Sequence, residues 1–217
     1  MTVTNWTKEK IQEISSKSSG GGFPSILKEW FIIDEINLNP LYNSVCGLCG
    51  RPNLYYEYFI SNRLNDNKIL IGSVCISLFF EEVDKIAVEA NGNILNLDKR
   101  EMKQHLNKLF IKRIILDVDS KINKTNLNDW EKNTFYPDVK EKVIKQEKLS
   151  PKQGNIFIKI VSKIVNEDEV ILKKIGKIIK INLAWSAYKE QLNSRDQYNW
   201  RFLKYALTEK QIKKFLD

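Results

Sequence analysis

The stretch VCGLCGRPNLYYEYFISNRLNDNKILIGSVCISLFFEE, from Val45 to Glu82, carries the residues that decide the fold of the first part of the chain. It opens with Cys46 and Cys49 in a C-x-x-C pair. Glycine within and directly after this pair permits the tight backbone turn that points two thiolates at one ion. Because Cys75 follows near the end of the stretch, the sequence predicts a metal site built from three thiolates.

Between the cysteines the sequence predicts a β-hairpin and then a helix. The aromatic run LYYEYFIS (54–61) is typical of a strand, NRLNDN (62–67) of a turn and KILIG (68–72) of a second strand. Ser73 can cap a helix that continues through ISLFFEE, which places Cys75 in its first turn. The hairpin therefore returns the chain to the first two cysteines.

This order of knuckle, hairpin and helix-borne cysteine resembles the treble-clef class of zinc fingers. The C-x-x-C-G…G-S-x-C pattern is also similar to small zinc-binding proteins of bacterial and phage mobile elements. The resemblance covers residues 45–82 and implies a bound Zn²⁺ with a structural role. Treble clefs take two ligands from the helix, three residues apart, but Leu78 stands three residues after Cys75.

The fourth ligand is therefore open at the level of sequence. His105 is the only histidine and is our candidate, while Glu81, Glu82 and Asp84 are the nearest carboxylates, and zinc accepts both ligand types. Three reduced cysteines buried in a core, without any metal, are the alternative interpretation.

Composition limits the class of protein. The chain has 217 residues, of which 42% are hydrophobic, which is enough for a sizeable core. No apolar run approaches the roughly 18 residues of a membrane span, and the first residues lack a signal-peptide apolar region. Three cysteines, an odd number, fit a reducing compartment better than a disulfide framework. We therefore expect a cytoplasmic protein with no membrane partner.

The pattern of charges and apolar residues predicts an α+β chain in three parts. Residues 1–92 form the zinc-finger domain and carry a net charge of −3, whereas the rest carries +11. Residues 93–140 hold an amphipathic helix (98–117) and a polar, Asn-rich linker (118–140). Residues 141–217 form a basic helical module, with helices expected at 151–165, 168–182, 183–193, 195–206 and 209–216. Three of these begin with a Ser or Thr three residues before Gln, the signature of a capping box.

The basic module supplies the candidate nucleic-acid contacts. An apolar stripe on the helix near residue 175 leaves lysines on the other face, and further basic residues alternate with aromatic ones after residue 184. The candidate set is Lys173, Lys174, Lys177, Lys180, Lys189, Arg195, Arg201 and Lys204. A solvated helix face and core aromatic residues are the alternative interpretation.

Motifs for common hydrolases, dehydrogenases and nucleotide-binding proteins are absent from the sequence, so we expect no enzyme. The leading hypothesis is a zinc-containing protein, of phage or mobile-element type, that binds DNA or RNA with little sequence specificity. The alternative is a protein-interaction module that antagonises or adapts a host protein through the finger and its acidic surround.

Overall fold

The chain forms two compact units in the computed structural model, which describes residues 6–82, 86–88, 94–181 and 201–216. The units comprise residues 1–110 and 111–217, and the division falls inside helix α4 (Lys99–Lys121). Helices and strands are both present, so the predicted α+β class is confirmed. The predicted boundaries at 92 and 140 do not coincide with this division, because strand β5 (Ile94–Asn96) belongs to the sheet of the first unit.

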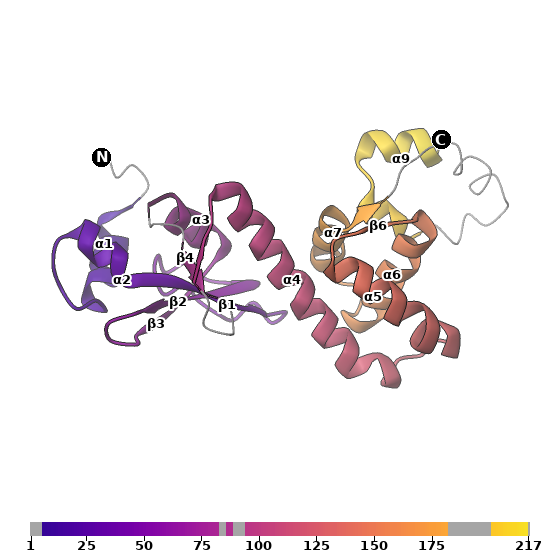
Figure 1. Cartoon of the computed structure of the whole chain (residues 1–217), viewed down its shortest axis with the longest axis horizontal. Helices are drawn as coiled ribbons and strands as arrows, with labels where there is room; N and C mark the ends of the chain where they lie inside the picture. The colour runs from indigo at the N-terminus through magenta and orange to yellow at the C-terminus, as the bar shows by residue number, and fades with distance from the viewer. Residues whose placement is uncertain (1–5, 83–85, 89–93, 182–200, 217) are drawn as a thin grey trace. The chain divides into compact units, whose positions relative to one another are not determined.

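The first unit is built on a five-stranded sheet with the order β3-β2-β1-β4-β5. Its centre is β1 (Trp30–Leu38), which pairs antiparallel with β2 (Tyr56–Asn62) and parallel with β4 (Ile86–Val88). Strand β3 (Lys68–Ile71) pairs antiparallel with β2 (Figure 1), so the predicted hairpin is confirmed.

The first unit also contains the helices α1 (Lys8–Ser16), α2 (Phe23–Glu29) and α3 (Ser73–Glu82), together with the first part of α4. Trp30 of β1 and Phe79 of α3 have no exposed surface, so both elements contribute large side chains to the core of the first unit. The segment before the knuckle consists of helix α2 followed directly by strand β1. Its apolar residues thus support the cysteine-bearing part of the chain, because a three-cysteine site buries little apolar surface by itself.

The predicted linker at 118–140 is wrong. Helix α4 runs to Lys121, and the chain continues through the 3₁₀ turn η1 (Ile122–Lys124) and the π-helical turn η2 (Glu131–Phe135) into α5 (Tyr136–Ile144). The segment packs because most of its apolar residues are buried and its one buried acidic residue, Glu131, is paired. Glu131 is only 5% exposed, and its Oε1 lies 2.7 Å from Nζ of Lys159.

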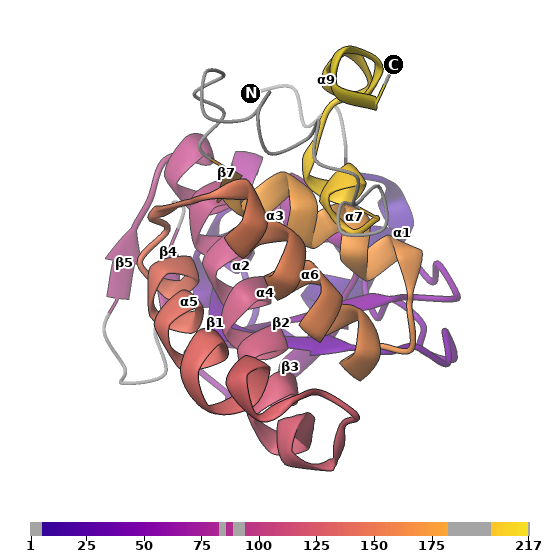
Figure 2. The same cartoon turned by 90° about the vertical axis from the view of Figure 1, so that its right-hand side faces the viewer.

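The second unit is mainly helical, as predicted. Helix α6 (Pro151–Ile164) begins with a complete capping box between Ser150 and Gln153, and the side chain of Asp168 caps the N-terminus of α7 (Glu169–Ile178). These helices run beside each other (Figure 2), and a short parallel pair of strands, β6 (Lys148–Leu149) and β7 (Lys180–Ile181), joins their ends.

The last part of the second unit contains the 3₁₀ turn η4 (Leu203–Ala206) and helix α9 (Glu209–Leu216). The predicted capping box at Thr208 is present, since Gln211 N–H donates to its Oγ1 and its own N–H donates to Gln211 Oε1. The expected helix at 183–193 lies outside the described residues, and so does the first half of the one at 195–206, whose second half contains η4. No helix in the part of the chain that the structure describes combines the length and apolar character needed to cross a membrane.

Candidate metal centre and lysine groove

The knuckle is a tight turn closed by its own backbone. Gly50 N–H donates to Cys46 O at 2.8 Å, and Cys46 N–H donates to Arg51 O at 2.9 Å. Gly50 has a φ of 68°, which glycine adopts without strain. This turn brings the two cysteines of the C-x-x-C pair to the same side of the knuckle.

The knuckle rests directly on the hairpin. Gly47 N–H donates to Leu70 O at 2.8 Å, and a Cβ on Gly47 would lie 2.9 Å from Cγ2 of Ile69. Only glycine allows this approach. Strand β3 then leads within two residues into α3, whose first turn carries Cys75. The local sequence therefore explains how the third cysteine reaches the first two.

The three cysteine sulfurs form one cluster, with Sγ atoms of Cys46, Cys49 and Cys75 all within 4.8 Å of one another. Two zinc–sulfur bonds of 2.3 Å in tetrahedral geometry hold their sulfurs about 3.8 Å apart, so a small contraction suits one zinc ion. Cys46 and Cys75 are buried at 1% and 2% exposure, whereas Cys49 is exposed. The residues therefore fit a metal ion, as the sequence predicted.

The electrostatics of the cluster favour a thiolate. A hydrogen bond from Cys75 lowers the pKa of Cys46 to about 5, with backbone N–H groups adding to the effect. The same sulfur contact, together with burial, raises the pKa of Cys75 above its ordinary range. The contact therefore favours the thiolate form of Cys46, and metal binding displaces the protons that remain on the three sulfurs.

His105 does not join this cluster, and the prediction that it is the fourth ligand is wrong for the described arrangement. Its Nε2 lies 2.8 Å from Oδ1 of Asp34, on β1. Among the described residues only the three cysteines group as metal ligands. Asp84 lies outside the described residues, as do the side chains of Glu81 and Glu82, so these carboxylates remain a prediction.

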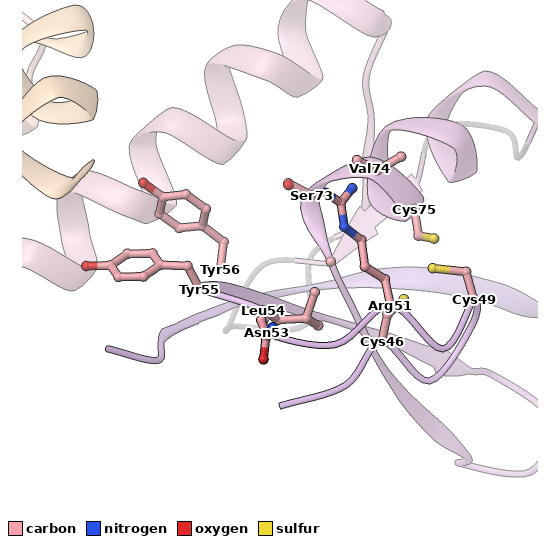
Figure 3. Close-up of a pocket in the computed structure, with 11 residues that line it drawn as sticks. Cys46, Cys49, Arg51, Asn53, Leu54, Tyr55, Tyr56, Ser73, Val74 and Cys75 are labelled. Carbon is pink, nitrogen blue, oxygen red and sulfur yellow. The ribbon is translucent and has the colours of Figure 1, made fainter. Parts of the chain in front are cut away.

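A cavity of about 330 Å³ opens beside the cysteines (Figure 3). All three cysteines line it, together with Arg51 from the knuckle, Ser73 and Val74 from α3, and Tyr55 and Tyr56. Sequence reasoning did not single out Arg51. Its position two residues after Cys49 was the available signal.

The candidate nucleic-acid residues are only partly brought together. Lys173 and Lys177 on α7 and Lys204 on η4 line one groove of about 670 Å³. We call this the lysine groove. Its apolar lining comes from the ends of α7, η4 and α9, namely Ile179, Tyr205, Ala206, Leu207 and Ile212. Glu169 also lines it and lies 2.8 Å from Nζ of Lys173.

The other predicted basic residues lie elsewhere. Lys174 is half-buried, and burial lowers its pKa to about 8. Lys180 follows the end of α7 in strand β7, so the four lysines do not form a single strip. Arg201 is exposed, lies 3.1 Å from Glu167 and has its guanidinium 5.5 Å from the ring centre of Phe202. Lys189 and Arg195 lie outside the described residues.

Close backbone packing positions the groove. A Cβ on Gly176 would lie 1.8 Å from Tyr205 O, so α7 and η4 touch through their backbones. From the other side, Oδ1 of the buried Asn155 accepts hydrogen bonds from the N–H groups of Phe202 and Leu203. Residues 173 and 204 therefore share one groove because α6 and α7 fix η4.

In comparisons with known proteins, no family model, no curated protein and no solved structure matches the chain.

Proposed function

We propose that the chain is a zinc-containing, non-enzymatic protein that binds DNA or RNA through its second unit. Cys46, Cys49 and Cys75 hold Zn²⁺, which stabilises the first unit in the manner of a treble-clef finger. The lysine groove contacts the phosphate backbone. The observation that supports this most strongly is that Lys173, Lys177 and Lys204 line one groove although they come from two elements.

The chemistry of the groove suits a polyanion. Lysine acts on phosphate as a point charge, which requires proximity rather than fixed geometry. Glu169 neutralises Lys173 in the free protein, and a phosphate that displaces this carboxylate regains the charge. Because lysine contacts to phosphate position a protein without reading bases, binding is expected to be nearly independent of sequence.

The test measures affinity for fluorescent single-stranded and duplex DNA and RNA against salt. Three lysine contacts give a slope of log affinity against log salt of about −3. Simultaneous replacement of Lys173, Lys177 and Lys204 by Gln should flatten the slope by roughly 2 to 3 units.

The control removes the same charge elsewhere in the second unit. Lys121, Lys124 and Lys145 are exposed and line no part of the groove. Their replacement by Gln should leave the slope within about 1 unit of wild type. Failure of the wild-type protein to bind any of the four nucleic acids at low salt would refute the nucleic-acid proposal.

The second candidate function is a protein-interaction module directed at a host protein. It is favoured by two exposed apolar residues that directly precede two of the clustered cysteines, Val45 (53%) and Val74 (53%). Exposed apolar groups that gather in one region are typical of protein contacts. Replacement of Val45 and Val74 by Ser should abolish capture of a protein partner in a nuclease-treated pull-down, while nucleic-acid affinity stays unchanged.

A further inference from the structure

The metal centre faces solvent on one side only. Cys46 and Cys75 are buried, whereas Cys49 is exposed and borders the cavity beside the cluster. Zinc in proteins takes four ligands, and the described residues group three thiolates. The coordination position that the three thiolates leave open therefore faces the cavity.

Arg51 is the positive side chain of this cavity. It is exposed, and within the described part of the chain it makes no ion pair and no hydrogen bond through its side chain. Figure 3 shows its side chain running from the knuckle toward Ser73, on the same side as the cysteines. A cation beside a metal centre that has no acidic partner among the residues the structure describes is poised for an anion from outside.

The charges of the centre indicate what kind of anion fits. Three thiolates cancel Zn²⁺ and leave one net negative charge, and the guanidinium of Arg51 brings the centre to neutrality. When a monoanion binds, the net charge of the centre becomes −1, whereas a phosphate dianion would make it −2. A carboxylate also matches the planar fork of a guanidinium, and its oxygen is an ordinary zinc ligand.

We propose that the fourth ligand is an external carboxylate, with one oxygen on the metal and the other on Arg51. This rests on the metal part of the proposed function and is independent of the lysine groove. The cavity of about 330 Å³ is much larger than the roughly 30 Å³ share of one water, so it accommodates a carboxylate with its attached carbon chain. Val74 lines it from the helix side, which suits an amino-acid side chain as the source.

The experiment uses the full-length protein loaded with Co²⁺, whose d–d and thiolate charge-transfer bands report the ligands. Acetate is titrated at constant ionic strength against chloride, and inorganic phosphate is titrated in parallel. We expect acetate to shift the d–d bands with saturation, while phosphate has a weaker effect. Arg51→Gln should raise the half-saturating acetate concentration roughly three- to fivefold, as expected for one exposed charged contact.

Two further measurements complete the design. Lys68→Gln is the matched control, because Lys68 is exposed in the same unit and does not line the cavity, and it should leave the titration unchanged. A short peptide with a single Glu distinguishes the sources. If the peptide half-saturates the site at a concentration well below that of acetate, the ligand is a protein side chain. If the two half-saturating concentrations are equal, the ligand is a small carboxylate. Both outcomes support the site.

Two results would overturn the proposal, and they are distinguishable. Charge-transfer bands that form but respond to neither acetate nor peptide assign the fourth position to a residue of the chain itself and leave the metal site intact. Absence of the charge-transfer bands means that the cysteines bind no metal, and the metal part of the proposed function then fails as well.

Discussion

Nε2 of His105 lies 2.8 Å from Oδ1 of Asp34, with 11% and 4% of the two side chains exposed. This contact joins α4 to the central strand of the first unit. The only histidine of the chain thus contacts a carboxylate in the core and does not join the cysteine cluster, so we expect it to stabilise the fold rather than the metal. The first prediction separates these roles.

His105→Ala should leave the zinc content unchanged and lower the free energy of unfolding by about 1 to 3 kcal/mol, because Asp34 loses a buried partner. Elemental analysis and urea denaturation measure the two quantities. Lys103→Ala, at an exposed site on the same helix, is the control and should change the unfolding free energy by less than about 0.5 kcal/mol. Loss of zinc from a folded His105→Ala protein would contradict the assignment.

Removal of the metal should destabilise the first unit. Elemental analysis of the wild-type protein should give about one zinc per chain, and Cys75→Ser should lose it, because binding and folding of such sites are coupled. A chelator should lower the melting temperature of the wild type and leave that of Cys75→Ser unchanged. Ser77→Ala, at an exposed position of α3, should behave as wild type. A metal-free protein of full stability would refute the prediction.

Two glycines of the second unit should differ in their tolerance of alanine. Gly176→Ala should cost about 2 kcal/mol or more and weaken nucleic-acid binding, since the new Cβ meets the backbone of Tyr205. Gly154→Ala should cost less, because its Cβ meets Cδ1 of Ile181, the mobile end of a side chain. Urea denaturation compares the two variants. Equal stability of both would show that α7 and η4 are not in backbone contact.

Lys174 should make stability depend on pH in the alkaline range. Burial lowers its pKa to about 8, below the ordinary 10.5. A group whose pKa is lower in the folded than in the unfolded protein contributes its stability fully above the pKa of the unfolded state. That stability is lost as the pH falls through the pKa of the folded state. The unfolding free energy should therefore contain a component that rises from pH 8 to 10.5.

Lys174→Met should remove this component and stabilise the protein near pH 7 by about 1 kcal/mol, because the buried stem stays and the charge is gone. Denaturation at pH 7, 8 and 10 measures both effects. Lys173→Met is the control, because Lys173 is exposed and paired with Glu169, and it should lack the alkaline component. A rise between pH 8 and 10 that survives in Lys174→Met would reject this account.

The sequence predicted the elements whose signals are local. The glycines around Cys46 and Cys49, the strand patterns on either side of the 62–67 turn and the Ser150 capping box each act within a few residues. Their structures could therefore be derived from conformational preference and hydrogen-bonding chemistry alone. The sequence also indicated that Cys75 returns to the knuckle, because a hairpin reverses the chain over a fixed length.

Tertiary structure decided the relationships between residues that are far apart in the chain. Asp34 and His105 are separated by 71 positions, and no local pattern marks them as partners. Residues 118–140 looked like a linker because they are polar, yet the burial of a few apolar side chains and the pairing of Glu131 with Lys159 fold them. Lys204 meets Lys173 and Lys177 only because Gly176 lets two backbones touch. Contacts of this kind depend on which faces pack together, and packing is set by the summed burial of the whole unit rather than by any short stretch.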